Sequence, residues 1–199
     1  MLSELNQEYK DLVFFPMKPG PCIVLPFSLT TDWVWEPKYD GWHTLFAVHR
    51  GRVRVFSRNL KMELTDWPGL RETIAELENN LRCFTGTLVG ELLASSGIST
   101  DVMKARSGVK VAPKFFDLVM PAFDMVPLYE RRRMLLDLPL PRDWFAHQAC
   151  IESQKVLEQT FRMCKDTCGM EGVVIKKFDS LYERSNTSPV VAYSWLKIK

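Results

Sequence analysis

Residues 44–49 form a mostly apolar run, residues 52–56 alternate between polar and hydrophobic, and together the two stretches predict a β-hairpin. Both stretches are rich in β-branched and aromatic residues, and they flank the dipeptide Arg50-Gly51, which suits a tight turn. In the second strand the two valines are expected to face one side of the sheet and the arginines the other, because side chains alternate along a strand.

Three segments instead carry hydrophobic residues at helical spacing. Leucine and isoleucine recur over residues 68–81 with charged residues between them, which predicts an amphipathic helix. A second helix is predicted over residues 127–138, because prolines at 139 and 141 would end it. A third helical pattern runs over residues 156–164, and Gly169 is suited to be its C-terminal cap.

Further short apolar runs predict strands between and after these helices. The last run alternates Leu196 and Ile198 with Lys197 and Lys199, so it directs two lysines to one face. The chain therefore alternates short strands and helices, without internal repeats. The predicted strands are residues 84–93, 114–120, 172–177 and 190–199.

Composition limits the class of protein. A chain of 199 residues with 46% hydrophobic and 25% charged residues is expected to form one main folded domain. No window approaches the ~18 uninterrupted apolar residues of a membrane helix, and the first residues lack the features of a secretion signal. We therefore expect no membrane contact, no secretion, and a cytoplasmic, nucleoid-associated or nuclear location. The net charge of +2 is close to balance, so any nucleic-acid site must be local.

The cysteines do not indicate a disulfide framework or a zinc site. They form an odd set without a CxxC pair, and three histidines are available to complete a metal site. We expect reduced thiols. Cys164 and Cys168 would share one helix face, where small apolar residues are a simpler interpretation than a metal or redox pair.

Charged residues at a few positions indicate a phosphate site. Lys38 and Asp40 share one side of an extended segment bounded by Pro37 and Gly41, and Glu91 and Glu171 interrupt or enter apolar strands. Taken alone, Lys38 and Asp40 are typical of a solvated turn, and Glu91 is typical of the edge of a strand. Considered with Lys197 and Lys199, these residues offer cations for phosphate oxygens and two carboxylates for a divalent cation.

No glycine-rich phosphate loop is present, so side chains would bind the phosphates. A lysine that acts as a nucleophile must be neutral when it attacks. Nearby cations, here Lys197, Lys199 and a bound metal, would lower the pKa of Lys38 and favour that neutral form.

At this point the sequence resembles the nucleotidyltransferase, or adenylation, domain of ATP-dependent DNA ligases, within the superfamily of polynucleotide ligases and capping enzymes. The resemblance covers residues 30–199 and consists of several short motifs in the family's order. Glu36-Pro-Lys-Tyr-Asp-Gly41 is similar to the lysine motif, in which Lys38 would bind AMP covalently. The run Pro127 to Leu135 is typical of DNA ligases, in particular bacterial ones.

The other motifs imply further contacts. Arg58 in Ser57-Arg-Asn59 would contact the nucleotide or a DNA end, and Phe116 would stack on adenine, although Phe116 also suits a plain core position. Lys176 and Lys177 are interpreted as a solvated strand end. The resemblance implies Glu91 and Glu171 as metal residues, and the following nucleotide-binding residues: Glu36, Pro37, Lys38, Tyr39, Asp40, Gly41, His43, Arg58, Glu91, Phe116, Glu171, Lys197 and Lys199.

Two features depart from the family pattern. His43 stands where most relatives have an arginine, and a histidine lacks the bidentate fork of a guanidinium. The sequence stops at Lys199, directly after the fifth motif, so no OB domain is expected within it. An OB-fold domain from a C-terminal part or from another chain is a predicted partner, and slow reaction with weak, salt-sensitive nick binding is expected without it.

The resemblance implies an α+β fold with two antiparallel-rich sheets, flanking helices and a nucleotide cleft between the sheets, similar to ATP-grasp proteins. Residues 1–29 are predicted to be an N-terminal extension packed on a core of residues 30–199. The implied function is a DNA ligase that uses ATP and Mg²⁺, or Mn²⁺, and acts on nicked DNA. An RNA ligase with the same mechanism, a capping guanylyltransferase and a non-catalytic module that binds nucleotides or DNA ends remain alternatives.

Overall fold

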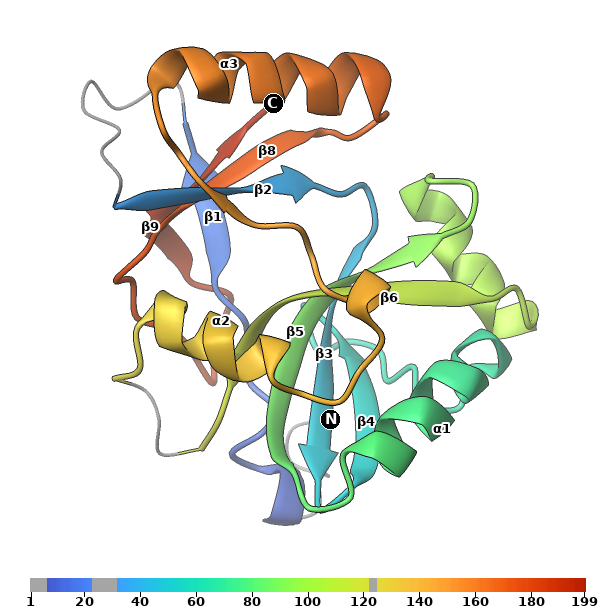
Figure 1. The fold of residues 1–199 in the computed structure, drawn as a ribbon. Coiled ribbons are helices and arrows are strands. Elements are labelled where there is room, and N and C mark those ends of the chain that lie inside the picture. Colours follow the sequence, from blue (N-terminus) through green and yellow to red (C-terminus); the bar gives the residue numbers. More distant parts are fainter. Residues whose placement is uncertain (1–6, 23–31, 122–124) are drawn as a thin grey trace.

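Two β-sheets form the frame of the molecule in the computed structural model, which describes residues 7–22, 32–121 and 125–199 (Figure 1). Neighbouring strands are antiparallel, except that β1 runs parallel to β9. The first sheet has the order β1 (Lys18–Pro21), β9 (Val191–Ile198), β8 (Gly172–Lys177), β2 (Trp33–Lys38), β7 (Ala149–Cys150); the second has β4 (Arg52–Ser57), β3 (Trp42–His49), β5 (Thr85–Ala94), β6 (Val111–Val119).

The predicted hairpin is confirmed as β3 and β4. Its turn places Arg50 at φ +46° and Gly51 at φ +79°, the left-handed conformations that a tight hairpin turn requires. Val53 and Val55 are buried whereas Arg52 is exposed, so the predicted alternation also holds. Strand β3 of this hairpin also pairs with β5, so β3 and β5 form the centre of the second sheet and β4 one of its edges.

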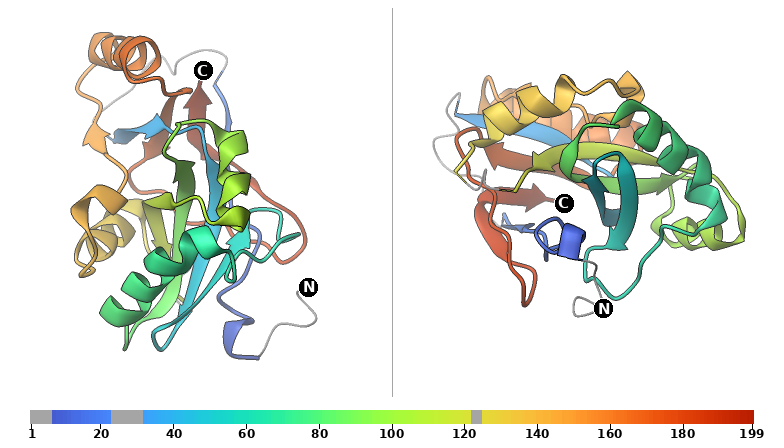
Figure 2. Two further views of the ribbon diagram at one scale, coloured as in Figure 1. Left: turned by 90° about the vertical axis from the view of Figure 1, so that its right-hand side faces the viewer. Right: turned by 90° about the horizontal axis from the view of Figure 1, so that it is seen from below.

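The three predicted helices are present as α1 (Arg71–Asn80), α2 (Leu128–Leu136) and α3 (Gln154–Arg162). A short 3₁₀ turn, Pro68–Leu70, precedes α1, and a π-helical turn, Met163–Thr167, follows α3. Gly169 has φ +63° just beyond that turn, as expected for a C-terminal cap. Figure 2 shows α1 and α3 on separate sheets. The sequence analysis missed the 3₁₀ segments Gln7–Tyr9, Ser99–Ser107 and Arg142–Trp144.

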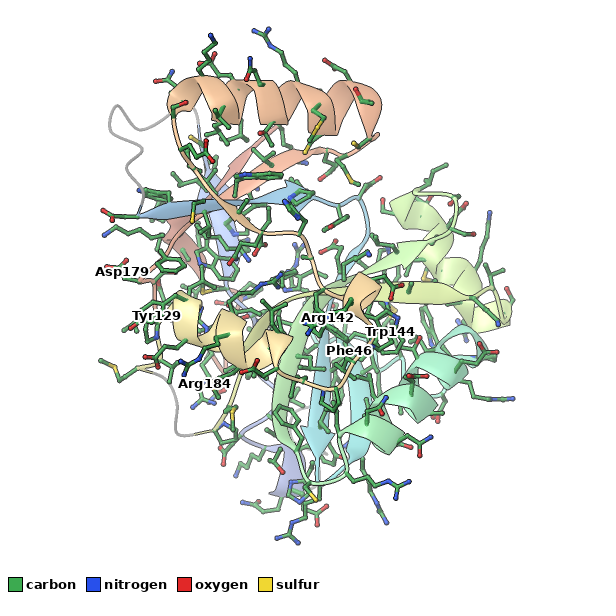
Figure 3. The ribbon with its side chains drawn as sticks, viewed as in Figure 1. Phe46, Tyr129, Arg142, Trp144, Asp179 and Arg184 are labelled. Carbon is green, nitrogen blue, oxygen red and sulfur yellow. The ribbon has the colours of Figure 1, made fainter. Side chains whose placement is uncertain are left out.

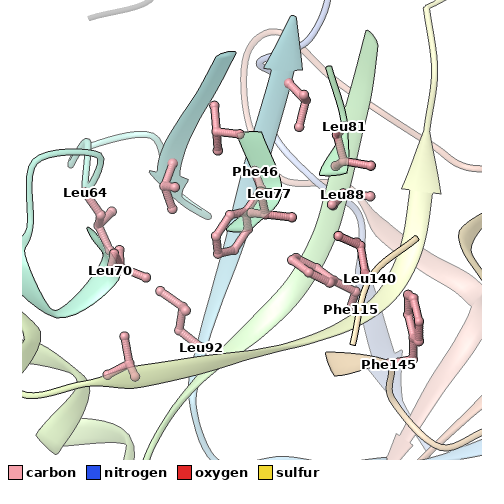
Figure 4. Close-up of a cluster of buried hydrophobic side chains, with 14 of the residues drawn as sticks. Phe46, Leu64, Leu70, Leu77, Leu81, Leu88, Leu92, Phe115, Leu140 and Phe145 are labelled. Atoms are coloured by element: carbon pink, nitrogen blue, oxygen red, sulfur yellow. The ribbon is translucent and has the colours of Figure 1, made fainter. Parts of the chain in front are cut away.

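The second sheet is buried on both faces. Along β3, Phe46 points into one hydrophobic cluster and its neighbour Leu45 points into another. In the first cluster Leu77 of α1 packs with Phe46 and with Leu88 of β5 (Figure 4). Because both faces are covered, β3 is an almost continuous apolar run over residues 44–48.

Residues 7–17 cover the other face of that sheet. Tyr9, Phe14 and Met17 are buried there with Trp195 of β9. The predicted boundary at residues 29 and 30 lies outside the described residues, so the division into extension and core stays a prediction.

A third cluster lies between α3 and the first sheet. Leu157 and Cys164 pack there against Val173 and Ile175 of β8. Cys168 is exposed, so only Cys164 fits the expectation of a small apolar helix residue. No helix in the described part of the chain has the length and apolar character to cross a membrane.

Helix α2 joins the two sheets through buried arginines. Arg131 is 3% exposed, and its Nε and Nη2 donate to the two carboxylate oxygens of Asp117 on β6 at 2.8 and 2.9 Å. At the start of the same helix, Tyr129 lies beside the segment after β8 that contains Asp179 (Figure 3), and the Tyr129 N–H donates to Phe178 O at 3.1 Å. These contacts tie the helix to β6 of the second sheet and to the segment that follows β8 of the first.

Candidate functional site

A cavity of about 450 Å³ lies between the two sheets. Strands β1, β2, β8 and β9 of the first sheet contribute to its walls. The second sheet contributes β3, β5, β6 and the segment after β4, and Ala146 lines the cavity from the segment before β7. Most of the residues predicted to bind the nucleotide line this cavity. They are Glu36, Pro37, Lys38, Tyr39, Gly41, His43, Arg58, Glu91, Phe116, Lys197 and Lys199.

Two of the predicted residues lie beside the cavity rather than in its lining. Asp40 accepts a hydrogen bond from the Ser99 N–H at 3.5 Å and so connects the Lys38 segment to the 3₁₀ segment that follows β5. Glu171 contacts the Lys38 ammonium with one carboxylate oxygen, and its other oxygen accepts from Lys199 Nζ at 3.0 Å. Glu171 thereby holds two of the candidate phosphate-binding cations.

Close approach of neighbouring strands explains two of the glycines around Lys38. A Cβ atom at Gly41 would lie 2.3 Å from Leu92 O and 2.8 Å from Glu91 Cγ. At Gly172, φ is +141° and a Cβ would lie 2.1 Å from Ile198 O. Larger residues at these positions would separate the strands that carry Glu91 and the two C-terminal lysines.

Lys38 lies at the end of β2, with its side chain 19% exposed. Burial is the largest cause that lowers the pKa of its amine, and the charges of Lys199 and Lys197 lower it further, against the opposing effect of Glu91 and Asp40. The effect of the neighbouring lysines was expected from the sequence, and burial is an additional cause. Both causes favour the neutral amine that a nucleophile requires.

Glu91 lies on β5 directly across from His43 on β3. Burial raises the pKa of its carboxyl from 4.5 to about 7, although the cations of Lys38 and Arg58 and the Gly41 N–H oppose the shift. Keeping this carboxyl charged near neutral pH therefore costs free energy, as is typical of functional sites.

This shift predicts that Glu91→Gln stabilises the fold at neutral and higher pH. Between pH 4.5 and 7 the native carboxyl binds more protons than the unfolded one, so its contribution to stability is lost as the pH rises through that window. A glutamine side chain does not titrate, so the variant does not lose this stability. From pH 4.5 to 7 we expect the free energy of unfolding of the variant to increase relative to that of the unmodified chain. The increase is at most about 1.4 kcal/mol for each unit of pKa shift.

Thermal unfolding in EDTA across pH 4.5–8 measures this difference, with Glu152→Gln as the control at an exposed carboxylate. A difference between Glu91→Gln and the unmodified chain that is independent of pH would contradict the raised pKa.

His43 does not supply the cationic contact that the resemblance assigns to an arginine at its position. Its Nε2 is buried without a hydrogen-bond partner among the described residues, and its ring packs edge-on against Phe116 with centroids 5.3 Å apart. Burial, followed by the charges of Arg58 and Lys176, lowers its pKa to about 3. The imidazole is neutral at pH 7 and offers no cation to a phosphate.

Lys176 corrects the interpretation of a solvated strand end. Lys177 is exposed, but Lys176 is 1% exposed and its Nζ lies 2.6 Å from Glu36 Oε2. The ammonium also lies 3.9 Å from the ring centroid of Trp195 and 4.5 Å from that of Phe116. Lys176 is therefore part of the aromatic wall of the cavity.

Several lining residues escaped the sequence analysis, among them Lys18, Trp195 and Ala146. Trp195 lies two positions before Lys197 in the same motif, so it could have been included among the predicted site residues. Gln148, whose amide donates to Glu36 Oε1 at 2.7 Å, carries no motif that would have found it.

The carboxylates near Lys38 fit Mg²⁺ in their chemistry. No group of three or more His, Cys, Asp or Glu side chains in the described ranges could hold a metal ion by itself. Mg²⁺ commonly binds through one or two carboxylates, water and substrate phosphates, so Glu91 and Glu171 suit it without a complete protein cage.

Two sheets, a cleft between them and a partly buried lysine in the cleft agree with the adenylation domain that the sequence resembles. A model of the family "ATP dependent DNA ligase domain" matches residues 24–199. The chain therefore belongs to the family of ATP-dependent DNA ligase domains, as the resemblance implied.

Individual relatives agree with this assignment. The chain is 28% identical over 182 residues to a DNA ligase of Methanothrix thermoacetophila, covering 82% of the chain and 31% of that protein. It is 27% identical over 182 residues to the multifunctional non-homologous end joining protein LigD of Mycobacterium bovis, covering 85% of the chain and 22% of that protein. The chain thus spans less than a third of the length of these curated relatives.

Solved structures show the same fold. Mycobacterial DNA ligase D complexed with ATP and MES superposes with a TM-score of 0.68 at 23% identity, covering 92% of this chain and 59% of that one. Chlorella virus DNA ligase-adenylate gives a TM-score of 0.68 at 17% identity, covering 94% of this chain and 69% of that one. The expected α+β architecture with two sheets is confirmed.

Proposed function

We propose that this chain is the catalytic core of an ATP-dependent DNA ligase, with Lys38 as the residue that takes AMP. The observation that carries the proposal is the placement of the Lys38 amine in a cavity between the sheets, with carboxylates beside it and a row of cations along one wall. Burial and neighbouring cations lower the pKa of this amine, which suits a nucleophile.

The cavity divides into two ends that suit the two ends of ATP. Phe116, Trp195, Glu36 and Lys176 form an aromatic and polar wall for the base. Beside the Lys38 amine, Lys197 and Lys199 provide charge for the phosphates, and Arg58 lies in the segment after β4, which also lines the cavity. This arrangement supports base stacking at one end and phosphate binding at the other.

In the proposed first step, the neutral Lys38 amine attacks the α-phosphorus of ATP. A P–N bond forms, the P–O bond to the β-phosphate breaks with its electron pair on the leaving pyrophosphate, and the nitrogen releases one of its two protons to solvent. Lys197 and Lys199 stabilise the charge that develops on the phosphate oxygens. Glu91 and Glu171 are the residues that would hold Mg²⁺, or Mn²⁺, which supplies Lewis-acid stabilisation of the phosphates.

The later steps follow from the same adduct. AMP would pass from Lys38 to the 5′-phosphate of a nicked strand, and a 3′-hydroxyl would displace AMP to form the new phosphodiester. We propose nicked DNA as the substrate, which is supported by the family match and by relatives named as DNA ligases. An OB-fold domain, in a longer form of the chain or on another chain, is the proposed partner.

The direct test is incubation of the purified chain with radiolabelled ATP and Mg²⁺, followed by peptide mapping. We expect AMP on Lys38, and transfer of that AMP to a nicked DNA substrate in a second incubation. The same assay with nicked RNA and with GTP separates an RNA ligase and a capping enzyme. Binding to nicked DNA without any adduct would support a non-catalytic module instead and would contradict the proposal.

A further inference from the structure

The aromatic end of the cavity contains a carboxylate with a fixed orientation. Glu36 is 3% exposed; its Oε1 accepts from Gln148 Nε2 at 2.7 Å, and its Oε2 lies 2.6 Å from Lys176 Nζ. A carboxylate has about four lone-pair sites, so Glu36 can accept further hydrogen bonds from a ligand in the cavity. As the anion of an ion pair it accepts hydrogen bonds and donates none.

Gln148 reaches Glu36 through strand pairing. Strand β7 pairs with β2 in the register Trp35 opposite Ala149, which places Gln148 beside Glu36 in the next pair of the antiparallel ladder. The amide nitrogen of Gln148, rather than its oxygen, faces Glu36, because a carboxylate anion accepts hydrogen bonds and so needs a donor opposite it.

The segment before Gln148 is anchored to β6. The Ala146 N–H donates to Phe115 O at 2.8 Å, and the buried Arg132 guanidinium contacts Ala146 O and donates to Phe115 O at 3.4 Å. Gln148 is therefore held by the second sheet as well as the first, and so is the carboxylate that it contacts.

We propose that Gln148 determines base specificity by fixing the Glu36 carboxylate, so that the site accepts a purine with a 6-amino group and rejects one with a 6-oxo group. This inference rests on the proposed function. A 6-amino group donates to a free lone pair of Glu36, whereas a 6-oxo group brings an acceptor against an acceptor and leaves both unpaired. Without Gln148 the carboxylate has one fixed partner and can turn away from a 6-oxo group.

The test compares ATP with ITP, whose base carries a 6-oxo group and no 2-amino group. We expect Gln148→Met, which keeps the length of the side chain and removes its amide, to lower the ATP-to-ITP ratio of kcat/KM for adduct formation about tenfold. Most of the change is expected in KM. Gln148→Glu, which sets a second carboxylate against Glu36, is expected to lower the ratio as well and serves if the first variant fails to fold.

Gln154→Met is the matched control, because Gln154 donates to Glu158 at 3.0 Å on the exposed surface of α3, and its ratio is expected to stay unchanged. A ratio unaltered in both Gln148 variants, or an unmodified chain that does not prefer ATP, would overturn the inference.

A second readout separates this inference from the proposed function. If the unmodified chain forms no adduct, the proposed function fails, and thermal shifts with ATP and with ITP then test base selectivity alone. A preference for ATP that is lost in Gln148→Met and kept in Gln154→Met would still support the role of Gln148. Equal shifts for both nucleotides in all three proteins would refute it.

Discussion

Lys38→Arg is expected to form no AMP adduct while it still binds ATP. The guanidinium keeps the positive charge that faces Glu171 and the phosphates, but it stays protonated and has no lone pair for attack on phosphorus. The side chain at position 38 would therefore contribute to binding and no longer to the reaction. We expect the rate of adduct formation to fall by at least roughly 10⁴-fold.

Adduct formation is measured by intact mass after incubation with ATP and Mg²⁺, and ATP affinity by calorimetry. Lys155→Arg on the exposed face of α3 is the matched control and should react like the unmodified chain. An adduct of normal yield on the Lys38→Arg chain would place the nucleophile elsewhere. Loss of both reaction and ATP binding would instead assign Lys38 a binding role.

The largest expected effect on stability follows from the buried pair of Arg131 and Asp117. Asp117 is 0% exposed, and Arg131 also donates to the carbonyl oxygens of Val126 and Ser180 at 2.6 and 2.9 Å. Arg131→Met removes the partner of a fully buried carboxylate. We expect the free energy of unfolding to decrease by about 3–5 kcal/mol, because an uncompensated buried charge remains.

Urea unfolding measures this change, and two further variants identify its cause. Arg133→Met, on the exposed face of the same helix, is expected to cost less than about 0.5 kcal/mol. Arg131→Met combined with Asp117→Leu removes both charges and is expected to recover part of the loss. If the double variant were no more stable than Arg131→Met alone, lost packing rather than the uncompensated charge would explain the effect.

The sequence predicted the elements whose patterns are local. The hairpin over residues 44–56 followed from two runs of strand-forming residues and one turn dipeptide, and the helix over residues 68–81 from its spacing. The residues around Lys38 followed from short motifs that the sequence shares with the DNA ligase family. Periodicity, turn dipeptides and motifs are each contained in a short stretch of chain, so they appear in the sequence.

The residues that were misjudged depend on distant partners. Lys176 looks like a strand-end lysine until Glu36, Phe116 and Trp195 are placed around it. Nothing in the run Arg131-Arg132-Arg133 indicates that Arg131 and Arg132 are buried, because their partners Asp117 and Phe115 lie on β6. Gln148 contacts Glu36, which is 112 residues away in the sequence. Hydrophobic periodicity carries no information about such pairs.

The parallel pairing of β1 with β9 has a consequence for how the protein is made. Lys18 pairs with Val191 in that ladder, so β1 is synthesised early and must wait for a partner that leaves the ribosome much later. The strand that completes the pairing, β9, also carries Trp195 and Lys197 into the cavity. The nucleotide site and the last long-range strand contact therefore form in the same event, and partly made chains lack a cleft that could hold ATP.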